Sequence, residues 1–192
     1  YHYTRGKVED KSFTYSLKAA KLAQASYSHS LAIDLYNAAK EILEKNNKID
    51  STEYLDVSES LGEVYRLSGR FEDSLIVLKN AESLISAEDV IRRTQILSKM
   101  GDTLWDSGKV EETIKTLERG LSILGLYYPR TNIEVFLGIG LQFSLQMLHT
   151  LFPKIFVAQK YQEDTKKMIA VRIFNRIAHG YYFSDMNRTL YY

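Results

Sequence analysis

The sequence predicts an all-α fold, in which antiparallel helix hairpins stack as a repeat solenoid. Three observations predict it. Apolar residues recur with the helical period along almost the whole chain, only two prolines occur in 192 residues, and one block of residues occurs twice. Proline inside a helix removes a backbone donor and clashes with the preceding turn, so its scarcity leaves long stretches free to be helical.

Apolar side chains spaced three or four residues apart locate the individual helices. Leu31, Leu35, Ala38 and Ile42 form one such stripe. Short connections between helices make neighbours antiparallel, which gives stacked hairpins. The expected helices cover residues 8–26, 29–46, 51–68, 71–86, 89–107, 110–126, 132–152 and 161–184.

Capping chemistry supports the helix starts. A hydroxyl or carboxylate at the N-cap, followed three residues later by an acidic residue, satisfies backbone donors that have no partner within the helix. The pairs in which we expect this are Asp50 with Glu53, Ser86 with Asp89, and Thr131 with Glu134.

A block ending in glycine occurs twice, 39 residues apart. Leu61-Gly62-x-x-Tyr65-x-x-x-Gly69 aligns with Met100-Gly101-x-x-Leu104-x-x-x-Gly108. The last glycine of each block sits where a left-handed residue ends a helix. The same alignment then matches Ser74 with Thr113, Leu78 with Leu117, and Ala81 with Gly120.

These positions resemble the tetratricopeptide pattern, in which small residues let paired helices touch and large residues fill the gaps between them. The resemblance implies one helical-repeat domain over 1–192, which we interpret as a fragment of a longer chain. Its repeats are expected at about 8–46, 51–86 and 89–126, followed by a less regular helical region over 132–192.

Composition excludes several classes of function. The 25 basic and 24 acidic residues give a net charge of +1, without the basic excess of a nucleic-acid reader. The absence of cysteine excludes disulfides and thiolate metal sites and fits a cytoplasmic location.

A second resemblance is carried by four segments spread over the chain. They are Tyr1-His2-Tyr3 followed by Gly6, Ala32-Ile33-x-Leu35-Tyr36, Leu148-His149-x-x-Phe152-Pro153, and Ile177-Ala178-x-x-Tyr181-Tyr182-Phe183-x-Asp185. Together they resemble the C-terminal helical tails of large multidomain bacterial signalling ATPases, where a cyclase or kinase domain and an AAA-like domain precede the repeats. The resemblance implies that nucleotide chemistry lies upstream of this segment.

No constellation of catalytic or metal-binding residues emerges. Gly138-Ile139-Gly140 lacks the third glycine of a dinucleotide loop, because position 143 is Phe, and no strand precedes it. We therefore expect these glycines to serve close helix packing. The four histidines are far apart and have no cysteine beside them, so we expect no metal, no cofactor and no enzyme activity.

Binding is the better hypothesis. In tetratricopeptide arrays the first helix of each hairpin lines a concave groove, and the acidic residues on that face favour a basic or neutral partner. The alternative is an ordinary solvated helix face. Trp105 either anchors a ligand or closes its hairpin against Val110. The candidate groove residues are Lys21, Gln24, Asp56, Glu59, Glu63, Arg66, Gln95, Asp102 and Trp105.

Two further regions of the chain are strongly apolar. Residues 135–152 carry no charged side chain, but polar residues on one side favour a buried solenoid helix over a membrane span. The last helix carries Phe174, Ile177 and Tyr181 near the end of the chain. We expect that end either to self-associate into a homo-oligomer or to be covered by its own tail.

These patterns predict a non-catalytic module for protein–protein or intramolecular regulatory contacts within a larger signalling ATPase. Two alternatives remain open. One is a free-standing peptide-binding scaffold. The other is a regulatory domain that senses a small molecule in an apolar pocket near residues 133–152.

The lack of phosphate-binding motifs leads to the first prediction. ATP and magnesium at millimolar concentrations should leave the melting midpoint of the chain unchanged, because ligand binding to the native state would raise it. Differential scanning fluorimetry measures this, and a rise of several degrees would contradict the prediction.

Overall fold

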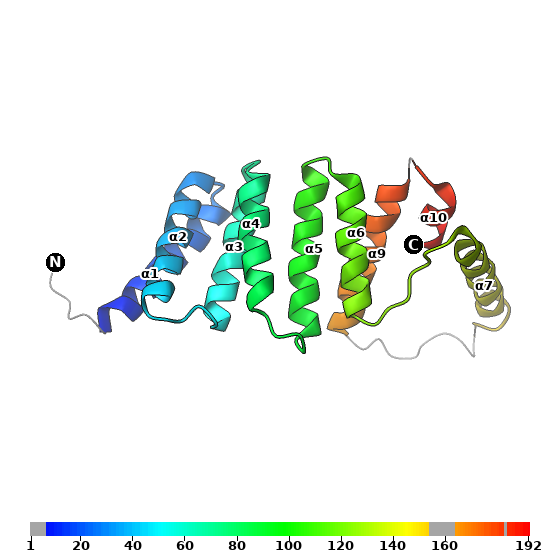
Figure 1. The fold of residues 1–192 in the computed structure, drawn as a ribbon, viewed down its shortest axis with the longest axis horizontal. Helices are drawn as coiled ribbons and strands as arrows, with labels where there is room; N and C mark the ends of the chain where they lie inside the picture. Colours follow the sequence, from blue (N-terminus) through cyan, green and yellow to red (C-terminus); the bar gives the residue numbers. More distant parts are fainter. Residues whose placement is uncertain (1–6, 154–163, 183) are drawn as a thin grey trace. The chain divides into compact units, whose positions relative to one another are not determined.

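The computed structural model describes residues 7–153, 164–182 and 184–192, and each regular element that it describes is a helix (Figure 1). The all-α prediction is confirmed. Tyr1, His2, Tyr3, Gly6, Phe183 and the expected helical start at 161 lie outside the described residues. The helices are α1 (Lys7–Ala25), α2 (His29–Lys45), α3 (Thr52–Leu67), α4 (Phe71–Leu84), α5 (Val90–Asp106), α6 (Val110–Ile123), α7 (Asn132–Leu151), α9 (Thr165–Tyr181) and α10 (Met186–Tyr191).

Two of the predicted helix ends are confirmed by their backbone conformation. Gly69 follows α3 with φ +74°, and Gly108 follows α5 with φ +78°. A side chain is strained in this left-handed region, whereas glycine adopts it freely. The repeated glycines therefore terminate corresponding helices.

The predicted helix starts are partly right. Thr131 and Glu134 form the complete capping box before α7. Asp50 is the wrong N-cap, because Ser51 takes that place and its hydroxyl accepts the N–H of Tyr54. The pairing of Ser86 with Asp89 is also wrong. Asp89 itself is the N-cap of α5 and accepts from the N–H of Arg92.

Contacts group the chain into two compact units, residues 1–109 and 110–192. The boundary falls between α5 and α6, inside the expected repeat 89–126. In unit 1, helices α1 to α5 pack in chain order, and α3 also contacts α5. Its core contains Ala20, Ala32, Ile33, Tyr36, Ala39, Val57, Leu61 and Val64.

Small residues let the helices of unit 1 approach closely, as the repeat pattern predicts. A Cβ added at Gly62 of α3 would lie 2.8 Å from Cγ of Leu78 on α4, and Leu78 is fully buried. Between α4 and α5, the buried hydroxyls of Ser74 and Thr103 share a hydrogen bond of 3.1 Å.

In unit 2, α6 packs against α9, and α10 folds back over them. Ile114, Leu117 and Leu121 meet Ile173 and Ile177. A second set of contacts comes from the tail. The ring of Tyr192 stacks on Tyr181 at 5.8 Å, lies 5.9 Å from Phe174, and its hydroxyl donates to Glu118.

Of the two arrangements expected for the chain end, the structure confirms coverage by its own tail, since the tail packs on the apolar face of α9. Burial raises the pKa of the Tyr192 hydroxyl, and the nearby Glu118 carboxylate raises it further. Burial also raises the pKa of Glu118. Self-association of this end stays a prediction.

The expected burial of residues 133–152 is wrong. Val135 is the buried residue of α7, whereas large side chains such as Phe136 and Leu141 are exposed. Among the described helices of unit 2, its neighbour is α10, which at six residues is too short to cover a twenty-residue helix. The apolar side chains of α7 thus form an open face rather than an enclosed pocket. No helix in the described part of the chain is long and apolar enough to cross a membrane.

Close packing at Gly62 leads to the second prediction. Gly62→Ala adds a methyl group against Leu78, and overpacking should outweigh the gain in helix propensity, lowering stability by about 1–2 kcal/mol. Asn80→Ala is the control, because Asn80 is exposed on the same helix as Leu78, and alanine there should raise stability by about 0.5 kcal/mol through its higher helix propensity. Urea unfolding measures both, and equal effects would contradict close packing at Gly62.

Candidate binding groove

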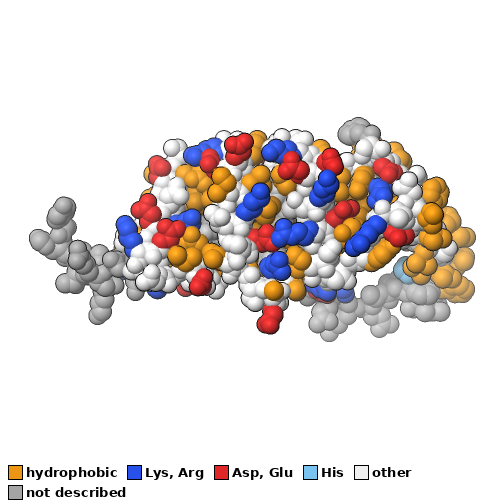
Figure 2. All heavy atoms as spheres, in the orientation of Figure 1, with side chains coloured by type: hydrophobic (Ala, Val, Ile, Leu, Met, Phe, Trp, Pro, Cys, Tyr) orange, Lys and Arg blue, Asp and Glu red, His pale blue; other side chains and the backbone are white. Residues whose placement is uncertain are grey.

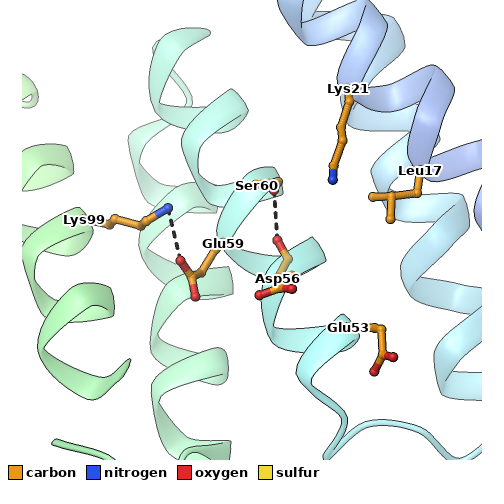
Figure 3. Close-up of a pocket in the computed structure, with 7 residues that line it drawn as sticks. All are labelled: Leu17, Lys21, Glu53, Asp56, Glu59, Ser60 and Lys99. Carbon is orange, nitrogen blue, oxygen red and sulfur yellow. Dashed lines mark hydrogen bonds and ion pairs between the residues drawn. The ribbon is translucent and has the colours of Figure 1, made fainter. Parts of the chain in front are cut away.

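Helices α1, α3 and α5 of unit 1 together line a hollow of about 270 Å³ (Figure 3). These are the first helices of the expected hairpins, and α2 and α4 contribute no lining residue. The lining residues are Leu17, Lys21, Glu53, Asp56, Glu59, Ser60 and Lys99.

The predicted groove residues Lys21, Asp56 and Glu59 line this hollow. Glu59 and Ser60 lie three and four residues after Asp56, which places both of them beside Asp56 on α3. Lys21 reaches toward them from α1 (Figure 3). The structure therefore brings together three of the nine predicted side chains.

Glu59 is the centre of an ion-pair network between α3 and α5. Its Oε2 lies 3.1 Å from Nζ of Lys99, and its Oε1 lies 2.5 Å from the Arg92 guanidinium. Arg92 also contacts Asp56 at 2.5 Å. The Glu59 side chain is only 12% exposed, so these pairs are shielded from solvent screening more than surface pairs are.

This network changes the predicted electrostatics of the groove. The sequence predicts that the carboxylates of Asp56 and Glu59 favour a basic partner, but both are neutralised by cations of α5. Arg92 and Lys99 were missed by the sequence analysis. They lie three residues before and four residues after Gln95 on α5, so the same helical spacing identifies them.

Two charged side chains of the hollow remain available to a ligand. Within the described residues, neither the Lys21 ammonium nor the Glu53 carboxylate takes part in an ion pair, and both residues are exposed. They stand on different helices, α1 and α3 (Figure 3). The hollow thus presents one cation from α1 and one anion from α3.

Gln24 has a structural role instead. Its Oε1 accepts a hydrogen bond of 2.7 Å from the Tyr36 hydroxyl and joins α1 to α2. Burial raises the pKa of that hydroxyl, which therefore stays a donor.

Glu63 and Arg66 form a second link between α3 and α5. The Arg66 guanidinium binds Glu63 at 2.6 Å and also contacts the Asp106 carboxylate. The two carboxylates, Glu63 first, raise the pKa of Arg66. Both predicted residues are therefore occupied within the protein.

The remaining predicted residues lie on α5 outside the hollow. Asp102 is buried, and Gln95 and Trp105 are half-buried. Asp102 and Trp105 each have interaction partners in the structure. The two alternatives for Trp105, ligand anchor or hairpin closure, both stay predictions. No cluster of three or more metal-ligating side chains occurs among the described residues.

The position of Glu59 leads to the third prediction. Glu59→Gln leaves Lys99 and Arg92 without their shared carboxylate, which should lower stability by about 1–3 kcal/mol. Glu111→Gln is the control, because that carboxylate is 83% exposed and pairs with Lys115 on its own helix, so its loss should change little. Thermal unfolding of both variants measures the difference, and equal midpoints would refute a stabilising role for Glu59.

Known structures with the same fold share little sequence with this chain. The TPR-like repeats of a kinesin light chain candidate from Podosopora anserina are 13% identical, with a TM-score of 0.53 over 92% of this chain and 90% of that one. A single-substitution variant of the same protein is 12% identical, with a TM-score of 0.53 over 98% and 93%. BtubC from P. vanneervenii is 16% identical, with a TM-score of 0.54 over 91% of this chain and 65% of that one.

Comparisons at the level of sequence identify no related family or protein. No family model matches the chain, and no curated protein matches it. At identities this low, the structural likeness bears on the fold alone. The comparisons therefore show an all-α helical repeat of the tetratricopeptide-like kind.

Proposed function

We propose that unit 1 is a non-catalytic binding module whose groove takes an extended protein segment, supplied by a partner or by a neighbouring domain of the same protein. One observation carries this proposal. The hollow is lined by the first helices of the hairpins, and its Lys21 and Glu53 form no ion pair with any residue that the structure describes.

The chemistry of the walls defines the kind of segment that fits. Lys21 on α1 attracts a carboxylate, and Glu53 on α3 attracts a cation. Leu17 adds an apolar contact beside Lys21. A segment that carries both an acidic and a basic side chain complements this groove better than a purely basic one, because Asp56 and Glu59 are already paired.

The side chains in the hollow favour binding over catalysis. Ser60, whose hydroxyl is the nucleophilic group among the lining residues, donates to the Asp56 backbone carbonyl at 2.9 Å. A serine nucleophile needs a base at this distance to take its proton, and a backbone carbonyl is not one. We infer that the groove recognises its ligand without transforming it.

We extend the proposal to a setting within a larger, cytoplasmic signalling ATPase, in which the groove holds a neighbouring regulatory segment. Support comes from the segments quoted above, including Leu148-His149-x-x-Phe152-Pro153, and from the absence of cysteine. The complete reading frame tests this extension. A phosphate-binding loop upstream of residue 1 is expected, and a frame without one would refute the extension while leaving the groove proposal intact.

Binding through Lys21 is the fourth prediction. Peptides selected from a random display library against the wild-type chain should bind Lys21→Glu at least about tenfold more weakly, because a carboxylate contact becomes a repulsion. Fluorescence anisotropy at two salt concentrations measures this, and higher salt should weaken wild-type binding.

Lys79→Glu is the matched control for this experiment. Lys79 is an exposed lysine on α4, which is the second helix of its hairpin and does not line the hollow. Its reversal changes the net charge equally and should leave affinity unchanged. Equal losses in both variants, or selected peptides that ignore Lys21, would refute the groove as the binding site.

A further inference from the structure

Hydrophobic side chains gather over α7 in unit 2 (Figure 2). Ten large apolar side chains of this helix and its C-cap are between 41% and 74% exposed, unlike those of a helix packed in a core. They are Ile133, Phe136, Leu137, Leu141, Phe143, Leu145, Met147, Leu148, Leu151 and Phe152.

Only one side of α7 is covered. Val135 is buried, the ring of Tyr191 from α10 lies against Gly138, and Gln142 donates to the Tyr191 carbonyl. At 3.6 residues per turn, the side turned away from these positions forms an open stripe. The open stripe consists of Ile133, Leu137, Gly140, Leu141, Ser144, Met147, Leu148 and Leu151.

Six of the eight residues of the open stripe form pairs of similar size about position 142. Ile133 and Leu151 lie nine residues to either side, Leu137 and Met147 five, and Gly140 and Ser144 two. In a two-fold interface residue i of one copy meets residue j of the other, and j meets i, so small residues would face small ones and large residues would face large ones. We propose that the open stripe pairs antiparallel with the open stripe of a second copy of this chain.

The small residues lie where the two helices would cross. Gly140 of one copy would meet Ser144 of the other, and a Cβ added at Gly140 meets no atom within 4 Å in the single chain. Small residues at a crossing allow two backbones to approach closely, while larger side chains on either side interdigitate. Gly138 serves packing within the chain, and Gly140 serves packing between chains.

Charge and area also favour a second copy. No charged residue lies between Val135 and Leu148, so two identical stripes do not repel each other. The six large apolar side chains of the open stripe, with Phe136 and Phe143 that border it, offer roughly 800 Å² of apolar surface, on the order of 100 Å² each. A stable dimer typically buries about 800 Å² per partner.

A lipid surface fits α7 less well. Helices that lie in a membrane interface carry lysine and arginine on a polar face, and residues 132–151 contain neither.

The fifth prediction tests this pairing with the 192-residue chain in analytical ultracentrifugation at increasing concentration. The wild type should form a dimer. Leu137→Glu should raise the dimer dissociation constant at least about tenfold, because the interface would then bury an unpaired charge. Leu22→Glu is the matched control, since Leu22 of α1 and Leu137 are both 70% exposed, and it should leave the dimer intact.

A double variant tests the antiparallel register. In Leu137→Glu/Met147→Lys, the two introduced charges are ten residues apart, about 15 Å along one helix, and cannot pair within a chain. Across the proposed interface, position 137 of one copy meets position 147 of the other. The double variant should therefore recover the dimer that each single substitution loses, and circular dichroism should show unchanged helix content in all variants.

Other outcomes overturn the proposal. A wild type that stays monomeric, or a dimer that survives Leu137→Glu, would exclude the open stripe as a self-association surface. Failure of the double variant to recover the dimer would exclude the antiparallel register. A monomer that binds phosphatidylcholine vesicles through Leu137 would assign the open stripe to lipid. The test does not depend on the groove of unit 1, so either proposal can fail alone.

Discussion

Close approach between neighbouring helices is the constraint on which unit 1 depends. Gly62 lets the side chain of Leu78 lie against the backbone of α3, and the hydroxyls of Ser74 and Thr103 meet between α4 and α5. Larger residues at these positions would separate the helices and open the core. Because the small residues fix the spacing of the hairpins, they also fix the spacing of α1, α3 and α5, and thus the width of the groove.

Charged residues of the groove serve structure and recognition together. Glu59 and Arg66 join α3 to α5 through their ion pairs, whereas Lys21 and Glu53 make no such pair within the described residues. The walls are therefore held in place by groups that a ligand cannot easily displace, since breaking a shielded pair leaves an uncompensated charge. A rigid groove lowers the entropic cost of ordering a bound segment.

Local features were predictable from the sequence, and features that depend on distant partners were not. Helical period located the helices, and Gly69 and Gly108 marked their ends, because both signals depend on a few adjacent residues. The partners of Glu59 come from α5, more than thirty residues away. Residue type alone therefore did not predict that its carboxylate is paired. The sequence also did not distinguish Ser51 from Asp50 as the N-cap of α3. Either residue type can cap a helix, and the backbone geometry decides between adjacent candidates.

The exposure of α7 shows that an apolar sequence does not by itself identify the surface against which a helix packs. Apolar residues show that a helix gains free energy from burial, but they do not identify the surface that buries it. In unit 1 each internal helix has a neighbour on either side, whereas the described neighbour of α7 is the short helix α10 on one side. The chain thus presents a charged hollow on unit 1 and an apolar stripe on unit 2. Salt weakens contacts at the hollow by screening its charges, and it has little such effect at the stripe, so ionic strength distinguishes binding at the two surfaces.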